Sequence, residues 1–156
     1  MDFVIQKATE LGVHRIVPVA AARSVVQLDA DRSNKRILHW QAVAAAACEQ
    51  CGRNTLPRID APLSFEAALG AVSNIACRVA LLPEAAASLA SVLVGTDQPK
   101  EIALLVGPEG GLEETEVERA LDCGFRAIRL GPRVLRTETA GLAALSALQC
   151  LAGDFA

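Results

Sequence analysis

Two short segments rich in glycine and proline carry charged side chains of opposite sign. The first, GPEGG at 107–111, follows the apolar run EIALLV and precedes the acidic stretch LEETEVE. The second, GPRVLRTE at 131–138, contains Arg133 and Arg136, with Arg129 just before it. Three glycines within five residues permit positive φ angles and let a ligand approach the backbone closely. Arginine side chains can bind RNA phosphates or the oxygen atoms of a base.

The acidic character of the first segment determines which ligand it suits. Its sequence lacks the lysine of a phosphate-binding P-loop, and it does not match the GxGxxG dinucleotide pattern. Carboxylates at the start of the following helix complement the helix dipole but repel a polyphosphate. S-adenosylmethionine (SAM) has an adenosine group, no phosphate and a sulfonium cation, so it fits better. A cofactor segment of this kind beside an arginine-rich substrate segment is what a nucleic-acid methyltransferase needs.

Other interpretations stay open on the residues alone. Glycine and proline are ordinary turn residues, so both segments could be plain tight turns between a strand and a helix. The same segments would also suit a domain that binds a nucleoside or RNA and transfers nothing. An enzyme acting on nucleotide phosphates is disfavoured by the acidic segment and the missing lysine.

Both segments follow predicted strands, and strands alternate with helices along the chain. We predict strands at 14–21, 58–60, 77–82, 101–106 and 125–130, and helices at 2–11, 31–51, 65–71, 84–93 and 139–153, with another ending at Cys123. Asp2 is expected to cap the first helix and Ser64 the third. The alternation predicts an α/β fold with a largely parallel sheet flanked by helices, in which ligands bind beyond the carboxyl ends of the strands. We expect one domain over residues 1–156.

Composition narrows the class of protein. With 52% hydrophobic residues the chain is not disordered, and with only 3% aromatic residues it does not suit a protein that stacks single-stranded bases. Its apolar runs are shorter than the ~20 residues of a membrane span, and its start lacks the basic stretch of a signal peptide. A cytoplasmic location is therefore expected, with no membrane partner.

The cysteines and the last helix give two further expectations. Five scattered cysteines favour free thiols, and the Cys48–Cys51 pair lacks the second pair that a zinc site needs, so no metal is predicted. The helix at 139–153 is apolar nearly all round and must be buried in the core or against another chain. A dimer is predicted on that basis.

Four segments resemble the ribosomal RNA small-subunit methyltransferase E family. They are KATELGV (7–13), CEQCGRN (48–54), LLVGPEGGLEETEVE (104–118) and LGPRVLRTETAGLAAL (130–145). The resemblance implies a SPOUT-class enzyme that transfers a methyl group from SAM to N3 of a uridine in 16S ribosomal RNA of the small subunit. It also implies a C-terminal trefoil knot and a homodimer with active sites at the interface. The N-terminal PUA-type RNA-binding barrel of the family is expected to be absent from this chain.

The resemblance also assigns a cofactor pocket to three backbone segments. Its residues are expected to be Leu82, Pro83, Gly107, Pro108, Glu109, Gly110, Gly111, Leu130, Gly131, Leu135 and Thr137. Leu130 and Leu135 would flank the adenine, although plain core packing would explain both leucines equally well.

Two residues are predicted to act in catalysis and three to contact RNA. Arg136 would stabilise the charge that develops on the uracil oxygens when N3 loses its proton. Glu138 would accept that proton or orient Arg136, or would simply complement the dipole of the following helix. Arg23, Arg53 and Arg133 are the candidate RNA contacts, against the alternative of a solvated surface.

Overall fold

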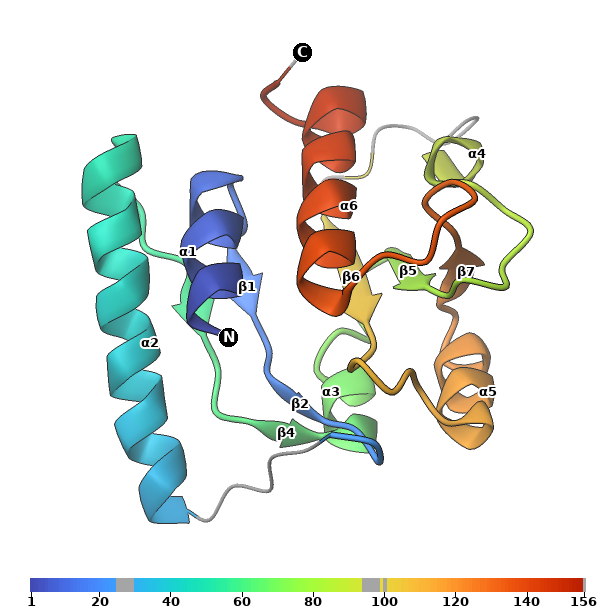
Figure 1. The fold of residues 1–156 in the computed structure, drawn as a ribbon, viewed down its shortest axis with the longest axis horizontal. Helices are drawn as coiled ribbons and strands as arrows, with labels where there is room; N and C mark the ends of the chain where they lie inside the picture. Colours follow the sequence, from blue (N-terminus) through green and yellow to red (C-terminus); the bar gives the residue numbers. More distant parts are fainter. Residues whose placement is uncertain (25–29, 94–98, 100, 156) are drawn as a thin grey trace.

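A computed structural model describes residues 1–24, 30–93, 99 and 101–155, and Figure 1 shows its arrangement of helices and strands. The helices are α1 Asp2–Glu10, α2 Ala30–Cys51, α3 Phe65–Gly70, α4 Leu89–Leu93, α5 Glu114–Asp122 and α6 Thr137–Ala152. The strands are β1 Arg15–Ile16, β2 Val19–Ala20, β3 Arg58–Ile59, β4 Leu63–Ser64, β5 Cys77–Leu81, β6 Ile102–Val106 and β7 Arg126–Ile128. Every pairing between these strands is parallel, which confirms the predicted α/β fold with a largely parallel sheet.

The central sheet has the strand order β6-β5-β7, so β5 lies between the two strands that precede the glycine segments. Leu81, the last residue of β5, is in register with Val106 of β6 and with Ile128 of β7. Because the strands are parallel and end together, the three following loops leave the sheet at the same edge.

Each face of this sheet is covered by its own pair of helices. One apolar cluster joins Val79 and Ile128 to α4 and α6 through Leu89, Val92 and Leu148. The side chain of Ala80 points to the other face, where a second cluster contains α3 and α5 residues. Neighbouring residues of a strand point to opposite faces, so the apolar run of β5 serves both clusters.

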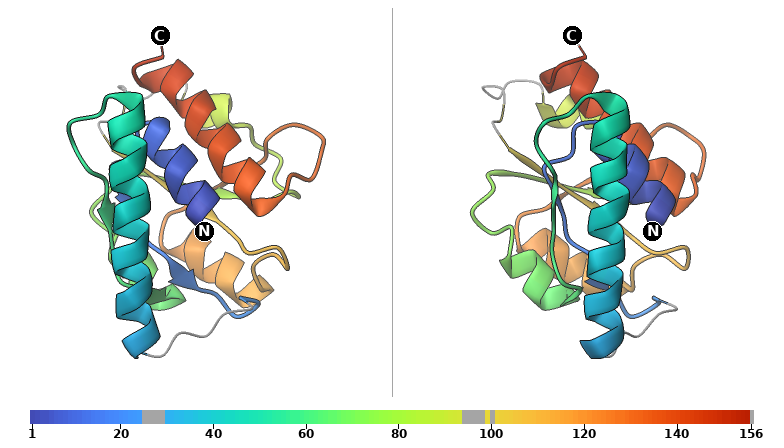
Figure 2. Two further views of the ribbon diagram at one scale, coloured as in Figure 1. Left: turned by 60° about the vertical axis from the view of Figure 1, so that its left-hand side comes forward. Right: turned by 90° about the vertical axis from the view of Figure 1, so that its left-hand side faces the viewer.

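The N-terminal residues form a separate layer beside the sheet. There, α1 and α2 pack together on the strand pair β1–β3, around Ile5, Trp40, Ala44 and Ile59, while the pair β2–β4 contacts α3. Figure 2 shows α1 lying between α2 and α6, which joins this layer to the sheet. The carboxamide of Gln149 in α6 donates a 2.7 Å hydrogen bond to the carbonyl of Leu11 at the end of α1.

Several predicted boundaries need correction. The strand predicted at 14–21 is split into β1 and β2 on either side of Pro18, since proline cannot donate a ladder hydrogen bond. The strand β4 was not predicted, because two residues carry no periodicity. The helix predicted at 84–93 begins only at Leu89, after Ser88, whose hydroxyl accepts a 3.3 Å hydrogen bond from the Ser91 amide.

The two predicted caps have different outcomes. Ser64 caps α3 and accepts a hydrogen bond from the amide of Ala67. Asp2 is not the cap of α1: Met1 occupies that position, and the Asp2 carboxylate lies 2.6 Å from His39 Nε2 of α2. The single-domain span and the C-terminal trefoil knot stay predictions.

Candidate functional site

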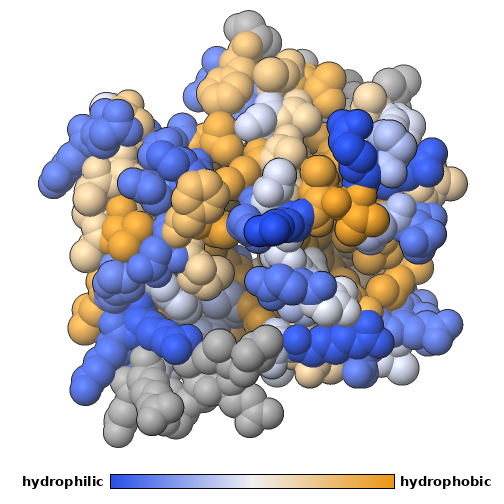
Figure 3. All heavy atoms as spheres, viewed as in Figure 1, coloured by the Kyte–Doolittle hydropathy of each residue, from blue (hydrophilic) through white to orange (hydrophobic). Residues whose placement is uncertain are grey.

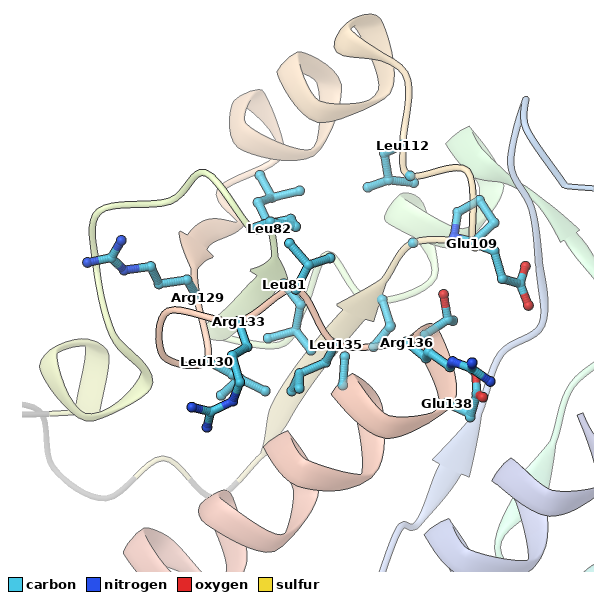
Figure 4. A pocket seen from close by; sticks show the side chains of 18 of the residues that line it. Leu81, Leu82, Glu109, Leu112, Arg129, Leu130, Arg133, Leu135, Arg136 and Glu138 are labelled. Carbon is cyan, nitrogen blue, oxygen red and sulfur yellow. The ribbon is translucent and has the colours of Figure 1, made fainter.

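The three loops at the carboxyl edge of the sheet surround a pocket of about 640 Å³ (Figure 4). Every residue predicted for the cofactor pocket lines it except Gly110. Arg133, Arg136 and Glu138 line it as well, from the β7–α6 loop and the first turn of α6. Residues separated by more than fifty positions in the sequence thus meet at one site because of the parallel strand order.

Glycine makes the tight turns of both loops possible. Gly111 and Gly131 have φ angles of 73° and 70°, in the left-handed region where a side chain is disfavoured. The amide of Gly111 donates a 2.8 Å hydrogen bond to the carbonyl of Pro108, which closes the first turn. Each turn brings the chain back toward the sheet edge, so backbone as well as side chains faces the pocket.

The pocket combines apolar walls with free backbone donors. Its apolar lining comes from all three strand ends and from the start of α6: Leu81, Leu82, Val106, Leu112, Ile128, Leu130, Leu135 and Ala140. Among the hydrogen bonds between described residues, none is donated by a backbone amide of residues 130–135. Leucine side chains can enclose a flat aromatic base while such amides bind its polar edge, so the lining suits a nucleoside.

The charged residues gather on two sides of the pocket. In Figure 4 the side chains of Arg136 and Glu138 lie next to each other at the start of α6, with Glu109 on the same side. The side chains of Arg129 and Arg133 extend on the opposite side. None of the ion pairs found between described residues includes any of these five, so their charges are available to a ligand.

The three predicted RNA contacts do not lie together. Arg133 lines the pocket, and the exposed Arg23 lies beside it, with Nη1 donating a 3.0 Å hydrogen bond to the carbonyl of Gly110. Arg53 lies elsewhere, in a second hollow of about 600 Å³ that includes Gln149 and Phe155. Its guanidinium binds backbone carbonyls at the end of α1.

Two residues near the pocket, Val134 and Glu116, were not assigned a role of their own from the sequence. Val134, at the tip of the β7–α6 loop, has 79% of its surface exposed. Arg129, which the sequence groups with Arg133 and Arg136, lines the pocket with them. Glu116 of α5 is buried, and its carboxylate accepts hydrogen bonds from two backbone amides. The acidic stretch after GPEGG contains Glu116, but no local pattern separates it from its exposed neighbours.

The thiols and other metal-binding side chains do not form a metal centre in the described part of the chain. No group of three or more histidine, cysteine, aspartate or glutamate side chains there is arranged to hold an ion. All five cysteines are free thiols; Cys48 is buried at the end of α2, while Cys51 is exposed. None of the described helices has the length and apolar character needed to cross a membrane.

The parallel sheet, the pocket at its carboxyl edge and the arginines at the rim of this pocket are typical of an RNA methyltransferase domain. Residues 1–149 match the model of the RNA methyltransferase domain family, and the chain belongs to that family. The resemblance to ribosomal RNA small-subunit methyltransferase E found in the sequence is thereby confirmed.

Relatives of known name and structure agree with this class. Ribosomal RNA small subunit methyltransferase E of Bacillus subtilis is 37% identical over 99% of this chain and 64% of its own length. The Neisseria gonorrhoeae enzyme of the same name, solved with bound SAM, superposes with a TM-score of 0.87 at 40% identity, over 100% of this chain and 62% of that one. A Legionella pneumophila methyltransferase with bound SAM gives 0.90 at 36% identity, over 97% and 61%. The chain thus spans about three fifths of the length of these relatives.

Proposed function

We propose that this chain binds SAM in the pocket at the carboxyl edge of the sheet and transfers its methyl group to N3 of a uridine in 16S ribosomal RNA. The observation that carries the proposal is the meeting of the β5, β6 and β7 loops around one pocket. Two relatives of similar fold were solved with SAM bound, and the named relatives are ribosomal RNA methyltransferases.

The pocket lining suits the parts of SAM. Leu130 and Leu135 flank the adenine, and free amides of the β7–α6 loop bind its polar edge. The sulfonium cation binds next to Glu109, since a carboxylate attracts positive charge. When bound, SAM supplies an electrophilic methyl group on its sulfur.

Arg136 and Glu138, on the same side of the pocket as Glu109, act on the uridine. N3 lies on the Watson–Crick edge, so the base must be unpaired or flipped out. When N3 loses its proton, negative charge spreads to the adjacent oxygens, where the Arg136 guanidinium stabilises it. Glu138 accepts the proton or orients Arg136. The N3 lone pair then forms the bond to the methyl carbon, and the carbon–sulfur bond breaks with its electron pair left on the sulfur.

Arg23 and Arg133, at the edge of the pocket, are the proposed contacts to RNA phosphates; Arg53 would contact RNA only at a distance from this pocket. Contacts of this kind position the RNA without reading its sequence. The proposed substrate, the RNA of the small ribosomal subunit, places the protein in the cytoplasm.

A second copy of the chain is the proposed partner for the face that contains α1 and α6. Figure 3 shows apolar side chains exposed on this face among charged ones. Phe3, Leu151 and Phe155 have 55, 48 and 51% of their surfaces exposed. Exposed apolar side chains on one face are typical of a surface that binds another protein chain. Light scattering is expected to give the mass of a homodimer at micromolar concentration; the mass of a monomer contradicts this part.

Calorimetry with S-adenosylhomocysteine, the product of the proposed transfer, tests the cofactor site. We expect saturable binding that is lost when Leu130 is replaced by a bulky charged residue, since the wall of the pocket is then blocked. A second assay follows transfer of a labelled methyl group from SAM to RNA of small ribosomal subunits. Binding without transfer identifies a silent nucleoside-binding domain instead of an enzyme.

A further inference from the structure

Glu116 is a buried carboxylate with two backbone partners. It has 8% of its surface exposed and lies in the first turn of α5, directly after the Gly107–Gly111 loop. One oxygen, Oε2, accepts a 2.9 Å hydrogen bond from the amide of Glu113 at the start of the same helix. The other, Oε1, accepts a 2.8 Å hydrogen bond from the amide of Ala22, 94 positions earlier in the chain.

The segment that Glu116 holds is a closed turn. The amide of Ser24 donates a 2.9 Å hydrogen bond to the carbonyl of Ala21, and the amide of Ala21 donates a 3.1 Å hydrogen bond to the Ser24 hydroxyl. The amide of Ala22 therefore points out of the turn toward α5. The bond from the Glu113 amide completes the cap of α5, so the bond from Ala22 is an additional contact between α5 and the distant turn.

A second contact joins the same turn to the Gly107–Gly111 loop. Arg23 Nη1 donates a 3.0 Å hydrogen bond to the carbonyl of Gly110. A Cβ atom added to Gly110 would lie only 3.3 Å from the Cβ of Arg23, so the glycine permits this close approach. The Ala21–Ser24 turn is thus bonded to the chain at two points, to Gly110 within the loop and to Glu116 in the helix that follows it.

We infer that Glu116 is a positioning residue that couples the cofactor loop to the turn presenting Arg23 to the RNA. This inference rests on the proposed function, since it requires a ligand at Gly107–Gly111. A ligand that restricts the loop also restricts the attached turn. The turn then loses less conformational entropy when RNA binds Arg23. By linkage, ordering of the turn strengthens ligand binding by the same factor.

Amide hydrogen exchange with and without S-adenosylhomocysteine tests the coupling in the whole chain. The readout is the Ser24 amide, because it donates to Ala21 and not to Glu116, so its exchange reports the order of the turn. Glu116→Ala removes the acceptor. Ala22→Pro removes the donor and leaves α5 intact, since proline is favoured at the second position of such a turn.

The matched control is Glu114→Ala. Glu114 is an exposed glutamate in the same first turn of α5, so this change removes the same charge without touching the Ala21–Ser24 turn. In the wild-type chain and this control, the ligand is expected to slow Ser24 exchange about fivefold or more, as a coupling of ordinary size requires. In Glu116→Ala and Ala22→Pro only the Arg23–Gly110 contact still joins the turn to the loop, so the ligand is expected to slow Ser24 exchange by clearly less than in the wild type while still protecting residues 107–112.

Two results overturn the inference, and they are distinguishable. If the ligand protects the 107–112 loop but slows Ser24 equally in all four proteins, or in none, Glu116 has only a structural role. If the ligand fails to protect the loop of the wild-type chain, the proposed cofactor site is wrong and the inference is lost with it.

Discussion

Arg53 donates a 2.6 Å hydrogen bond from Nη1 to the carbonyl oxygen of Thr9, which joins the residues after α2 to the last turn of α1. The same nitrogen donates a 3.0 Å bond to the carbonyl of Val13. A cation at the carboxyl end of a helix also interacts favourably with its dipole. The sequence predicts Arg53 to contact RNA, but these bonds add a structural role at the junction of two helices.

Arg53→Ala is therefore expected to lower the free energy of unfolding by about 2 kcal/mol, because charged hydrogen bonds to backbone are lost. Urea unfolding of the variant measures this loss, with Arg53→Lys as a control that keeps the charge. If stability stays at the wild-type level while RNA affinity falls, the contact to RNA is its main role.

The ion pairs of Asp60 make the free energy of unfolding depend on pH. Burial alone would raise the pKa of this carboxyl, but hydrogen bonds and charges from Arg15 and Arg58 outweigh burial and hold the pKa below its ordinary value of 3.8. Arg15 Nε and Arg58 Nε lie 3.1 and 2.6 Å from the carboxylate oxygens. A lowered carboxyl pKa contributes stability above the unfolded value of 3.8, and that stability is lost as pH falls through the lower folded pKa.

We expect Asp60→Asn to lose about 1–3 kcal/mol at pH 7, and the difference from wild type to shrink below pH 3.8. Thermal unfolding between pH 7 and pH 2.5 measures both. Glu66→Gln serves as the control, since the Glu66–Arg119 pair is exposed. A difference that stays constant with pH would show that the ion pairs of Asp60 do not stabilise the fold.

Gly12 and Gly52 end α1 and α2 with φ angles of 85° and 78°. Alanine at either position is expected to cost about 1–2 kcal/mol, the penalty for a left-handed residue. A Cβ atom at Gly52 meets nothing within 4 Å, whereas at Gly12 it would collide with the carboxamide of Gln149. Gly12→Ala should therefore also break the Gln149–Leu11 bond and lose about 1 kcal/mol more. Equal losses in urea unfolding would mean that Gln149 moves aside freely.

Arg136→Ala tests the catalytic assignment. We expect methyl transfer to small-subunit RNA to fall by a factor on the order of 10² to 10³, because a fixed cation no longer stabilises the developing charge. The affinity for S-adenosylhomocysteine and the melting temperature should be unchanged. Arg136→Lys keeps the charge but not the planar fork, so it should recover part of the rate. Transfer at the wild-type rate in Arg136→Ala removes this role.

The sequence predicts the central sheet and the outline of the site for a physical reason. Apolar runs before the glycine segments identify β6 and β7, the apolar run that ends at Pro83 identifies β5, and the parallel order follows from the helices between them. The contacts Glu116–Ala22 and Arg23–Gly110 span 94 and 87 positions, and no local pattern specifies them. Of the two-residue strands, β1, β2 and β3 lie within the strands predicted at 14–21 and 58–60. The strand β4 was not predicted, since alternation needs a longer run.

The order of the pocket's parts along the chain has a consequence for its synthesis. The walls come from residues 81–83, 106–112 and 128–140, so the final wall is the start of the last helix. A nascent chain emerging from its amino end cannot hold the ligand until α6 has docked, so the earlier elements must fold without that assistance. Once α6 has docked, a bound ligand stabilises the docked state, because the ligand binds only when the start of α6 is in place.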